Sequence, residues 1–241
     1  MKAFLLAAGE GTRLRPITNS IPKCLVPIRQ QPLLGIWLEL CRESGIDEVL
    51  INLHAHGDAV RQFLSTNDCG VRVTLSEEPV LLGSAGTIAA NRAWVESDAH
   101  FFVFYADVLT NMDLTAMLDF HRRAGMAATL GLYEVPNPSQ CGIVELDGKN
   151  IIRAFHEKPA QPTGNLAFSG VMIGTPEFLQ ALPADSPADL GFHLFPKLIG
   201  RMAGYVSREY LVDVGTMSNY EAAQQSWPGL GTVSRLESSH A

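Results

Sequence analysis

Two glycines and two cations stand close together near the start of the chain, directly after a short apolar stretch at 4–8. Gly9 and Gly11 let the backbone turn sharply and approach a ligand closely. Successive backbone N–H groups in such a loop form a nest that binds anions. Arg13 adds a planar fork of donors that matches phosphate oxygens, and Lys23 adds a compact point charge. Together these residues predict a phosphate-binding loop.

Two widespread phosphate-binding motifs do not describe this loop. A P-loop requires Gly-x-x-x-x-Gly-Lys-Ser/Thr, which the sequence lacks. A dinucleotide-binding fingerprint requires a third glycine three residues after Gly11, where this chain has Leu14. The loop is therefore neither of the kinase type nor of the dehydrogenase type.

Two aspartates are candidates for holding a metal ion. Asp107 follows the apolar stretch Phe101–Tyr105, and a carboxylate at the C-terminal end of a parallel strand is well placed to face a ligand crevice. Magnesium prefers one or two carboxylates together with phosphate oxygens and water. Taken alone, Asp107 is also compatible with capping the next helix, and Asp213, in an Asp-x-Gly-Thr segment, is also compatible with a turn.

The segments that must position these residues alternate in character through the first half of the chain. Strand-like segments are 4–8, 48–53, 71–76 and 101–105, and helix-like segments are 33–44, 58–64, 84–95 and 113–124. We expect Ser84 to cap the third of these helices, and Asp113 to cap the fourth or to stand in its first turn. Alternating βα units predict a mostly parallel sheet with helices on both faces.

The second half of the chain is richer in strands. Strand-like segments are 127–135, 142–146, 151–155 and 168–173, and helices are expected at 176–181, 194–202 and 218–225. The whole pattern predicts an α/β fold with a mostly parallel central sheet and a β-rich second half. We expect one domain over 1–227, made of the halves 1–125 and 126–227, with a flexible tail at 228–241.

The composition limits the class of protein. The chain has 241 residues and a formal net charge of -7, which argues against nucleic-acid binding because that usually requires a basic face. The four cysteines and seven histidines show no grouping typical of a metal site. No apolar run approaches the roughly 20 residues of a membrane helix, and the apolar start lacks a cleavage-type region. We therefore expect a soluble, cytoplasmic protein that does not bind membranes.

A long motif in the first 28 residues points to a family. The segments 9–16 (GEGTRLRP) and 22–28 (PKCLVPI) resemble the signature of the nucleoside-diphosphate-sugar pyrophosphorylases, which are sugar-1-phosphate nucleotidyltransferases. Glucose-1-phosphate thymidylyltransferases and mannose-1-phosphate guanylyltransferases belong to that family. The resemblance implies a Rossmann-like three-layer nucleotidyltransferase fold whose β-rich second half binds the sugar. It also implies that Arg13 and Lys23 are catalytic and neutralise charge around the α-phosphate and the departing pyrophosphate. The residues it places on the nucleotide at this end are Ala7, Ala8, Gly9, Gly11, Thr12, Arg13 and Lys23.

The same resemblance extends to both aspartates. Asp107 matches the metal-binding aspartate of the family's Gly-Asp-x-Leu segment, with Ala106 in place of the glycine. Asp213 matches the aspartate of the family's Trp-x-Asp-x-Gly-Thr-x-x-x-Tyr segment, with Leu211 in place of the leading aromatic residue. The resemblance therefore implies Mg²⁺ as the cofactor, with Asp107 and Asp213 as its ligands and Asp107 as a catalytic residue.

Further segments resemble the family's sugar and base sites. The stretches 142–145, 155–159 and 165–170 resemble its sugar-binding segments, which implies that the sugar phosphate contacts Gly142, Glu157, Lys158, Asn165 and Gly170. The stretch 82–87 (LGSAGT) resembles the Leu-Gly-Thr-Ala-Gly segment of guanylyltransferase-like members, which implies that the nucleotide contacts Gly83, Gly86 and Thr87. Glu77 or Glu78, and of the two Glu78 in particular, is expected to accept hydrogen bonds from a guanine ring. A solvated pair of surface glutamates is the alternative.

The resulting hypothesis is direct transfer between a nucleoside triphosphate and a sugar 1-phosphate. The stretch 82–86 favours GTP with mannose or manno-heptose 1-phosphate, whereas the stretch 165–170 is more similar to the thymidylyltransferases. The alternatives are dTTP or UTP with glucose 1-phosphate, a choline-phosphate or amino-sugar acceptor, and a non-catalytic nucleotide-sugar sensor. The sequence leaves open whether copies of the chain form a homo-oligomer.

Overall fold

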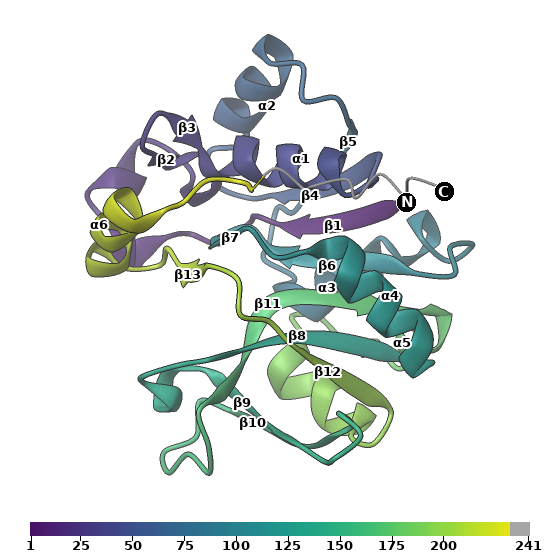
Figure 1. Cartoon of the computed structure of the whole chain (residues 1–241). Helices are drawn as coiled ribbons and strands as arrows, with labels where there is room; N and C mark the ends of the chain where they lie inside the picture. Colours follow the sequence, from purple (N-terminus) through teal and green to yellow (C-terminus); the bar gives the residue numbers. More distant parts are fainter. Residues whose placement is uncertain (232–241) are drawn as a thin grey trace, which may run out of the picture.

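The computed structural model describes residues 1–231, so positions 232–241 of the predicted tail lie outside the described residues. The strands of the central sheet are β1 (Lys2–Leu6), β4 (Glu48–Leu53), β5 (Arg72–Glu77), β6 (Phe101–Tyr105), β8 (Ala128–Glu134), β9 (Gly142–Leu146), β10 (Ile152–Glu157), β11 (Leu166–Gly174) and β12 (Met202–Val206). This nine-stranded sheet has the order β10-β9-β11-β6-β1-β4-β5, and β8 pairs with β11 and β12 (Figure 1). Two small sheets pair β2 (Pro27–Ile28) with β3 (Gln31–Pro32), and β7 (Val108–Thr110) with β13 (Leu211–Asp213).

The part of the sheet built by the first half of the chain is parallel. β1 pairs in parallel with β4 and with β6, and β4 pairs in parallel with β5. β11 then joins antiparallel to β6, with Val171 opposite Phe104, so one sheet runs through both halves of the chain. The predicted α/β fold with a mostly parallel central sheet is therefore confirmed.

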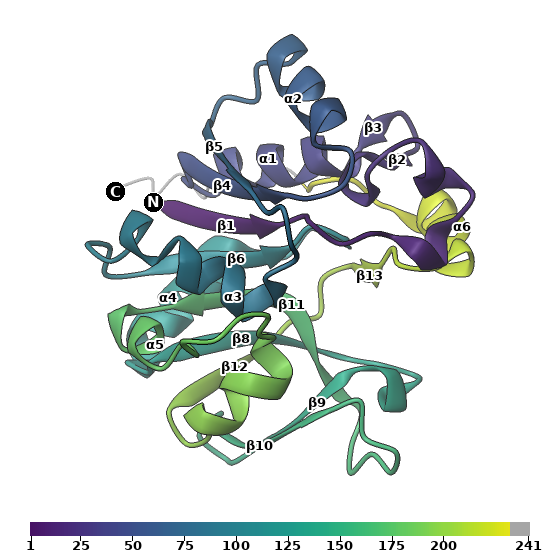
Figure 2. The ribbon, with the colours of Figure 1, turned by 180° about the vertical axis from the view of Figure 1, so that it is seen from behind.

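Helices cover both faces of the sheet. They are α1 (Leu33–Glu43), α2 (Gly57–Thr66), α3 (Gly83–Ala90), α4 (Leu114–Ala124), α5 (Pro176–Gln180) and α6 (Met217–Ser226). Side chains alternate along a strand: Leu5 of β1 packs in one hydrophobic cluster with residues of α1 and α4, and Phe4 packs in a second cluster with residues of α3. Figures 1 and 2 accordingly show α4 and α3 on opposite sides of the sheet. No helix of residues 1–231 has the length and apolar character needed to cross a membrane.

The helix predicted at 84–95 begins and ends earlier than expected. α3 begins at Gly83, and Leu82 stands at its N-cap without a side-chain hydrogen bond. The prediction that Ser84 caps this helix is wrong, because its hydroxyl instead donates to Asp189 Oδ2 at 2.8 Å. The prediction for Asp113 is confirmed, since its carboxylate accepts from the backbone N–H of Ala116 at 2.8 Å.

The helix predicted at 194–202 is also wrong. A π-helical turn spans Leu190–Leu194, a 3₁₀ turn spans Phe195–Leu198, and β12 starts at Met202. Proline at position 196 has no backbone N–H to continue an α-helix. Gly200 then adopts a left-handed φ of 79°, which turns the chain into β12.

The C-terminal segment returns to the first half of the chain. β13 pairs with β7, and the side chains of Tyr220 and Gln224 on α6 both donate to the carbonyl oxygen of Pro27, at 3.0 and 2.6 Å. Leu230 packs partly buried against the cluster that contains α1. Residues predicted to belong to the sugar-binding half thus also support the nucleotide-binding half.

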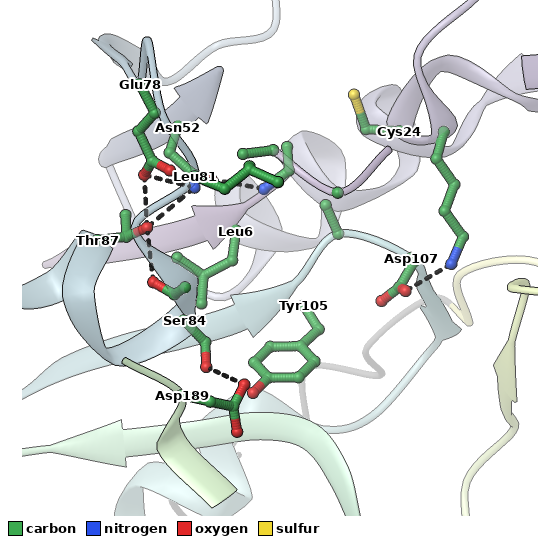
Figure 3. A pocket seen from close by; sticks show the side chains of 16 residues that line it. Leu6, Cys24, Asn52, Glu78, Leu81, Ser84, Thr87, Tyr105, Asp107 and Asp189 are labelled. Carbon is green, nitrogen blue, oxygen red and sulfur yellow. Dashed lines mark hydrogen bonds and ion pairs between the residues drawn. The ribbon is translucent and has the colours of Figure 1, made fainter. Parts of the chain in front are cut away.

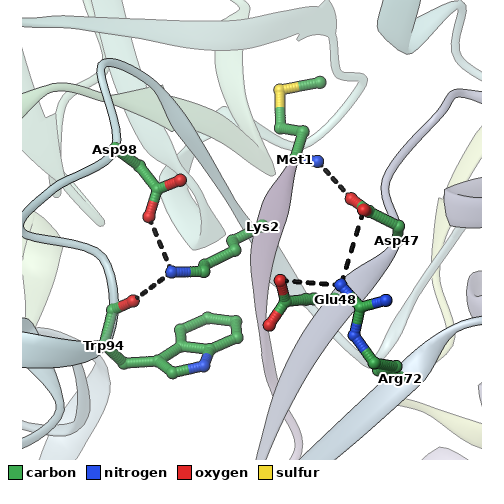
Figure 4. Close-up of polar contacts among 7 residues, drawn as sticks. All are labelled: Met1, Lys2, Asp47, Glu48, Arg72, Trp94 and Asp98. Carbon is green, nitrogen blue, oxygen red and sulfur yellow. Dashed lines mark hydrogen bonds and ion pairs between the residues drawn. The ribbon is translucent and has the colours of Figure 1, made fainter.

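Polar contacts hold the first residues of β1 (Figure 4). Lys2 Nζ donates to Asp98 Oδ2 at 2.9 Å and to the carbonyl oxygen of Trp94 at 2.7 Å. The amino group of Met1 forms an ion pair with Asp47, which also lies 3.6 Å from the guanidinium of Arg72. These contacts fix the strand that leads directly into the predicted phosphate loop.

Candidate active site

The predicted phosphate loop begins where β1 ends. The backbone N–H of Ala7 donates to Oδ1 of Asn52 on β4 at 2.6 Å. Gly11 has a left-handed φ of 64°, which favours glycine. Its carbonyl oxygen accepts from the hydroxyl of Thr18 at 2.8 Å, and a Cβ at position 11 would lie only 3.0 Å from Thr18 Cγ2. Both the conformation and the available space therefore require glycine at position 11.

A cavity of about 260 Å³ opens beside this loop (Figure 3). The predicted site residues that line it are Ala7, Ala8, Gly9, Lys23, Glu78, Gly83, Thr87 and Asp107. The lining is completed by Leu6, Cys24, Asn52, Leu81, Ser84, Tyr105, Ala106 and Asp189. The predicted residues outside this lining are Gly11, Thr12, Arg13, Gly86, Gly142, Glu157, Lys158, Asn165, Gly170 and Asp213. The cavity thus joins the glycine loop to the segment expected to read the base.

The predicted cations and carboxylates converge at one point. Lys23 Nζ lies 2.6 Å from Asp107 Oδ2 and 3.8 Å from Asp213 Oδ1. Gly215 leaves the room for this cluster, because a Cβ there would lie 2.9 Å from Arg13 Nη2 and 3.1 Å from Lys23 Nζ. Both cations and both carboxylates therefore lie in one cluster.

The pairing of two short strands brings the aspartates together. Asp213, the last residue of β13, stands opposite Val108 of β7, which directly follows Asp107. The backbone N–H of Val214 donates to the carbonyl oxygen of Asp107 at 2.9 Å. Main-chain bonds thus set the spacing of two carboxylates that are far apart in the sequence.

The carboxylate pair fits a divalent cation. Among residues 1–231, Oδ1 of Asp213 is buried and has no hydrogen-bond partner. Burial and the neighbouring charge of Asp107 raise the pKa of Asp213, and the cations Lys23 and Arg13 oppose this rise. A buried polar atom without a partner requires an explanation. A magnesium ion, which binds one or two carboxylates along with phosphate oxygens, would supply the missing partner.

Three predicted sugar-side residues lie together. A Cβ on Gly142 would lie 2.9 Å from Glu157 Oε2, and a Cβ on Gly191 would collide with the same oxygen. Lys158 Nζ lies 3.8 Å from Glu157 Oε1. Burial raises the pKa of Glu157, the charge of Lys158 opposes this rise, and the charge of Asp189 adds to it. Glycines on both sides leave the Glu157 carboxylate room beside the cavity wall.

The other two predicted sugar-side residues differ in their surroundings. Gly170 has a left-handed φ of 78°, and a Cβ there would lie 2.9 Å from Val108 Cγ2 and 3.1 Å from Tyr105 Cβ. Glycine at this position therefore lets β11 pass close behind Asp107. Asn165 is exposed just before β11, where its backbone carbonyl accepts from the N–H of Val135 at 2.8 Å.

Glu78 is not part of a solvated surface pair, and that alternative is wrong. Its side chain is only 3% exposed, whereas Glu77 is exposed. Oε1 of Glu78 accepts from Asn52 Nδ2 at 2.9 Å and from the hydroxyl of Thr87 at 2.5 Å. Oε2 accepts from the backbone N–H of Leu82 at 3.1 Å. The carboxylate that lines the cavity is therefore held by partners from β4, from α3 and from the residue that precedes α3.

The start of α3 is bound to the segment that precedes the π-helical turn. The carbonyl oxygen of Ala188 accepts from the N–H groups of Ala85 and Gly86, at 2.9 and 3.1 Å. A Cβ on Gly83 would collide with that carbonyl oxygen. Gly83 and Gly86 thus allow a close approach between the predicted base side and a segment of the second half.

Sequence reasoning missed several residues of the cavity wall, among them Asn52, Ser84, Tyr105 and Asp189. Asn52 carried a usable signal, because it is an amide within the otherwise apolar end of a strand and is buried in the structure. The sequence around Asp189 gives no such signal, because this residue lies in an irregular segment after Pro187. Its carboxylate accepts from the backbone N–H of Gly191 at 2.9 Å.

Comparison with models of protein families shows to which family the chain belongs. The model of a family described as nucleotidyl transferase matches residues 2–228. The chain belongs to this nucleotidyl transferase family. The family expected from the glycine loop and the two aspartates is thereby confirmed.

Curated members of the nucleotidyl transferase family include relatives with different stated substrates. The chain is 34% identical over 238 residues to UTP--glucose-1-phosphate uridylyltransferase of Synechocystis sp., covering 91% of this chain and 61% of that protein. It is 31% identical over 227 residues to mannose-1-phosphate guanylyltransferase 1 of Arabidopsis thaliana, covering 91% of this chain and 63% of that protein. The chain thus spans about three fifths of the length of these curated relatives.

Solved structures share the fold of this nucleotidyl transferase family member. A putative glucose-1-phosphate thymidylyltransferase from Bacillus anthracis superposes with a TM-score of 0.83 at 20% identity, covering 93% of this chain and 94% of that one. HddC from Yersinia pseudotuberculosis, complexed with GMP-PN, superposes with a TM-score of 0.80 at 23% identity, covering 94% and 99%. The likeness confirms the nucleotidyltransferase fold expected from the sequence.

Proposed function

We propose that the chain joins a nucleoside triphosphate to a sugar 1-phosphate and releases pyrophosphate. The observation that carries this proposal is the convergence of Lys23, Asp107 and Asp213 at one end of a cavity that the glycine loop lines. Cations and a carboxylate pair at that end suit the phosphates of a nucleotide. Family membership supports the same reaction class.

The reaction is an in-line displacement at the α-phosphorus of the triphosphate. An oxygen of the sugar phosphate forms the new P–O bond, the bond to the β-phosphate oxygen breaks, and pyrophosphate leaves with that electron pair. The sugar phosphate is already anionic near neutral pH, so no general base is needed. The residues then act by positioning and by neutralising charge, and good positioning alone supplies roughly 7–11 kcal/mol of barrier reduction.

Each charged residue has a proposed role. Lys23 and Arg13 pair with oxygens of the triphosphate and of the departing pyrophosphate. Asp107 and Asp213 would hold Mg²⁺, which when bound offsets charge on the phosphates and orients them. Lys158 pairs with the sugar phosphate, and the carboxylate of Glu157 accepts from sugar hydroxyls.

The proposed substrates are GTP and mannose or manno-heptose 1-phosphate. The stretch 82–86 resembles guanylyltransferase-like members, and Gly83 and Ser84 line the cavity at that end with small side chains. Several relatives at 29–31% identity are mannose-1-phosphate guanylyltransferases. In this reading Gly83, Gly86, Thr87 and Glu78 form the base side, and Gly142, Asn165 and Gly170 belong to the sugar side.

A second pair of substrates, UTP or dTTP with glucose 1-phosphate, also has support. The relative at 34% identity is a UTP--glucose-1-phosphate uridylyltransferase. The stretch 165–170 is likewise more similar to thymidylyltransferases. Both pairs share the reaction and the charged cluster, so the choice depends on the base and sugar ends of the cavity.

Pyrophosphate release measures the reaction and its specificity together. Purified protein with Mg²⁺ is tested against a grid of GTP, UTP, dTTP, ATP and CTP with mannose, manno-heptose and glucose 1-phosphates. We expect one pair, GTP with a manno-configured sugar phosphate, to exceed the others by about tenfold or more. If pyrophosphate is released faster with UTP or dTTP and glucose 1-phosphate, this second pair becomes the proposed substrates and the first pair is wrong. Tight nucleotide-sugar binding without release from any pair would favour a non-catalytic sensor.

A further inference from the structure

Three buried polar side chains in the cavity wall are joined by hydrogen bonds into one network (Figure 3). Asn52, Glu78 and Thr87 are 4%, 3% and 1% exposed. Asn52 Nδ2 donates to Glu78 Oε1 at 2.9 Å and to Thr87 Oγ1 at 3.1 Å. The hydroxyl of Thr87 donates to the same Oε1 at 2.5 Å. The three residues come from β4, from the residue after β5, and from α3.

The network ends on the backbones of two different loops. Oδ1 of Asn52 accepts from the N–H of Ala7, which is the first residue of the glycine loop. Oε2 of Glu78 accepts from the N–H of Leu82, which precedes Gly83 and ends the turn at 79–82. Leu81 of that turn lines the cavity. The network therefore connects the phosphate end of the cavity to its base end.

The chemistry of the groups fixes the orientation of the Asn52 amide. An ionised carboxylate only accepts, and an amide accepts at oxygen and donates at nitrogen. Because Asn52 Oδ1 accepts from Ala7, its nitrogen must face Glu78 and Thr87. Buried networks of this kind are rigid when every member is satisfied and fail together when one member is lost.

We propose that Asn52, Glu78 and Thr87 are positioning residues that hold the glycine loop and the turn at 79–82 at a fixed separation, so that one nucleotide is bound by its phosphates and its base at once. This inference rests on the proposed function, in which both loops contact the same nucleotide. In addition to the base contacts proposed above for Glu78 and Thr87, the network acts through the backbone N–H groups of Ala7 and Leu82, and none of the three side chains touches the reacting atoms.

Two matched pairs of variants test the network. Thr87→Val removes the hydroxyl and keeps the shape, and Thr87→Ser restores the hydroxyl. Glu78→Gln leaves one amide that cannot accept from all three donors, and Glu77→Gln makes the same change at the exposed neighbouring residue. We expect Glu78→Gln and Thr87→Val to speed amide hydrogen exchange about tenfold or more at both 5–9 and 80–84, and both controls to match the wild type.

Substrate kinetics provide a second readout that a merely structural role would not produce. We expect the KM for the nucleoside triphosphate to rise about tenfold in Glu78→Gln and Thr87→Val, with kcat and the KM for the sugar phosphate within about twofold. A fall in kcat and a rise in both KM values by the same factor would overturn the proposal, because it would indicate general misfolding.

Hydrogen exchange also separates this inference from the proposed function, since it needs no substrate. Faster exchange confined to 78–87, or unchanged exchange at 5–9 in Glu78→Gln, would overturn the inference even in an active enzyme. A wild-type protein that releases no pyrophosphate would overturn the proposed function, while faster exchange at both loops in the two variants would still support the network.

Discussion

The ammonium nitrogen of Lys23 lies 2.6 Å from Oδ2 of Asp107, and the lysine side chain is only 10% exposed. A second carboxylate, that of Asp213, lies 3.8 Å from the same nitrogen. The cation therefore stabilises two neighbouring like charges. Its removal should affect both the cluster and the proposed reaction.

Lys23→Met is expected to lower kcat/KM for pyrophosphate release by about 10²–10³, the loss typical of removing one preorganised charge-stabilising donor. Lys23→Arg keeps the charge, but a guanidinium is a planar fork and not a compact point charge, so we expect only partial recovery. Steady-state kinetics at saturating Mg²⁺ measure both variants. Activity of Lys23→Met within a few-fold of the wild type would remove Lys23 from the catalytic group.

Removing either aspartate charge should abolish most turnover. For Asp107→Asn and Asp213→Asn we expect kcat to fall by about 10² or more and the half-saturating Mg²⁺ concentration to rise, because an amide is a poorer ligand than a carboxylate. The control is Asp119→Asn, an exposed carboxylate 3.5 Å from Arg122 on α4. Near-normal turnover of either site variant at ordinary Mg²⁺ would contradict the metal assignment.

Asp213→Asn should also stabilise the metal-free protein. Oδ1 of Asp213 is buried without a hydrogen-bond partner in the described chain, and the charge of Asp107 adds repulsion. An amide removes that repulsion, so we expect a higher thermal midpoint in EDTA at neutral pH despite the lost activity. A lower midpoint than that of the wild type would show that the carboxylate supports the fold without metal.

Two glycines that both have a left-handed φ should differ in their tolerance of a methyl group. Gly83 and Gly125 have φ values of 75° and 61°. A Cβ on Gly125 meets nothing within 4 Å, whereas one on Gly83 would collide with the carbonyl oxygen of Ala188. We expect Gly125→Ala to cost about 1 kcal/mol of unfolding free energy, and Gly83→Ala about 3 kcal/mol or more. Urea unfolding measures both, and equal costs would contradict the close approach.

Stability should fall in acid because of a buried histidine, His121, that contacts the partly exposed His100. His121 is 1% exposed, His100 Nδ1 lies 3.1 Å from His121 Nε2, and Nδ1 of His121 lies 2.8 Å from Thr129 Oγ1. Burial, followed by the charges of His100 and Arg122, lowers the pKa of His121 from 6.5 to about 4. The unfolded chain thus binds this proton at higher pH than the folded protein.

The contribution of His121 to the free energy of unfolding is fully present above pH 6.5 and is lost as the pH falls toward 4. The loss reaches at most about 3 kcal/mol, since each tenfold change in proton affinity corresponds to about 1.4 kcal/mol. We expect His121→Gln to flatten the pH dependence of urea unfolding over this range. Identical pH profiles for the wild type and His121→Gln would refute this account.

The sequence predicts long, regular elements well and short, distant pairings poorly. Phe101–Tyr105 and Gly142–Leu146 have the predicted bounds, because each is an apolar run or alternation closed by polar or turn residues. β7 and β13 have only three residues each and exist because they pair with one another across about a hundred residues of chain. No local periodicity could indicate such a pairing.

The candidate site was predicted in the same uneven way. The motif around Lys23 and the order of Asp107 and Asp213 indicated the charged cluster, which the structure brings together. The burial of Glu78 could not be predicted, since its carboxylate depends on Asn52 and Thr87, which come from other elements. Asp189 lacked any pattern, because its position depends on contacts with α3.

The position of Asp213 near the end of the described chain has a consequence for biosynthesis. Once β11 has left the ribosome, the glycine loop, Lys23 and Asp107 have left it as well, and β11 can pair with β6. The second carboxylate enters only when β13 pairs with β7, and α6 then binds Pro27. A chain that ended between Asp189 and β13 would therefore keep every residue that lines the cavity while lacking Asp213. In the proposed function, such a fragment would bind nucleotide with only half of its metal site and would not turn it over.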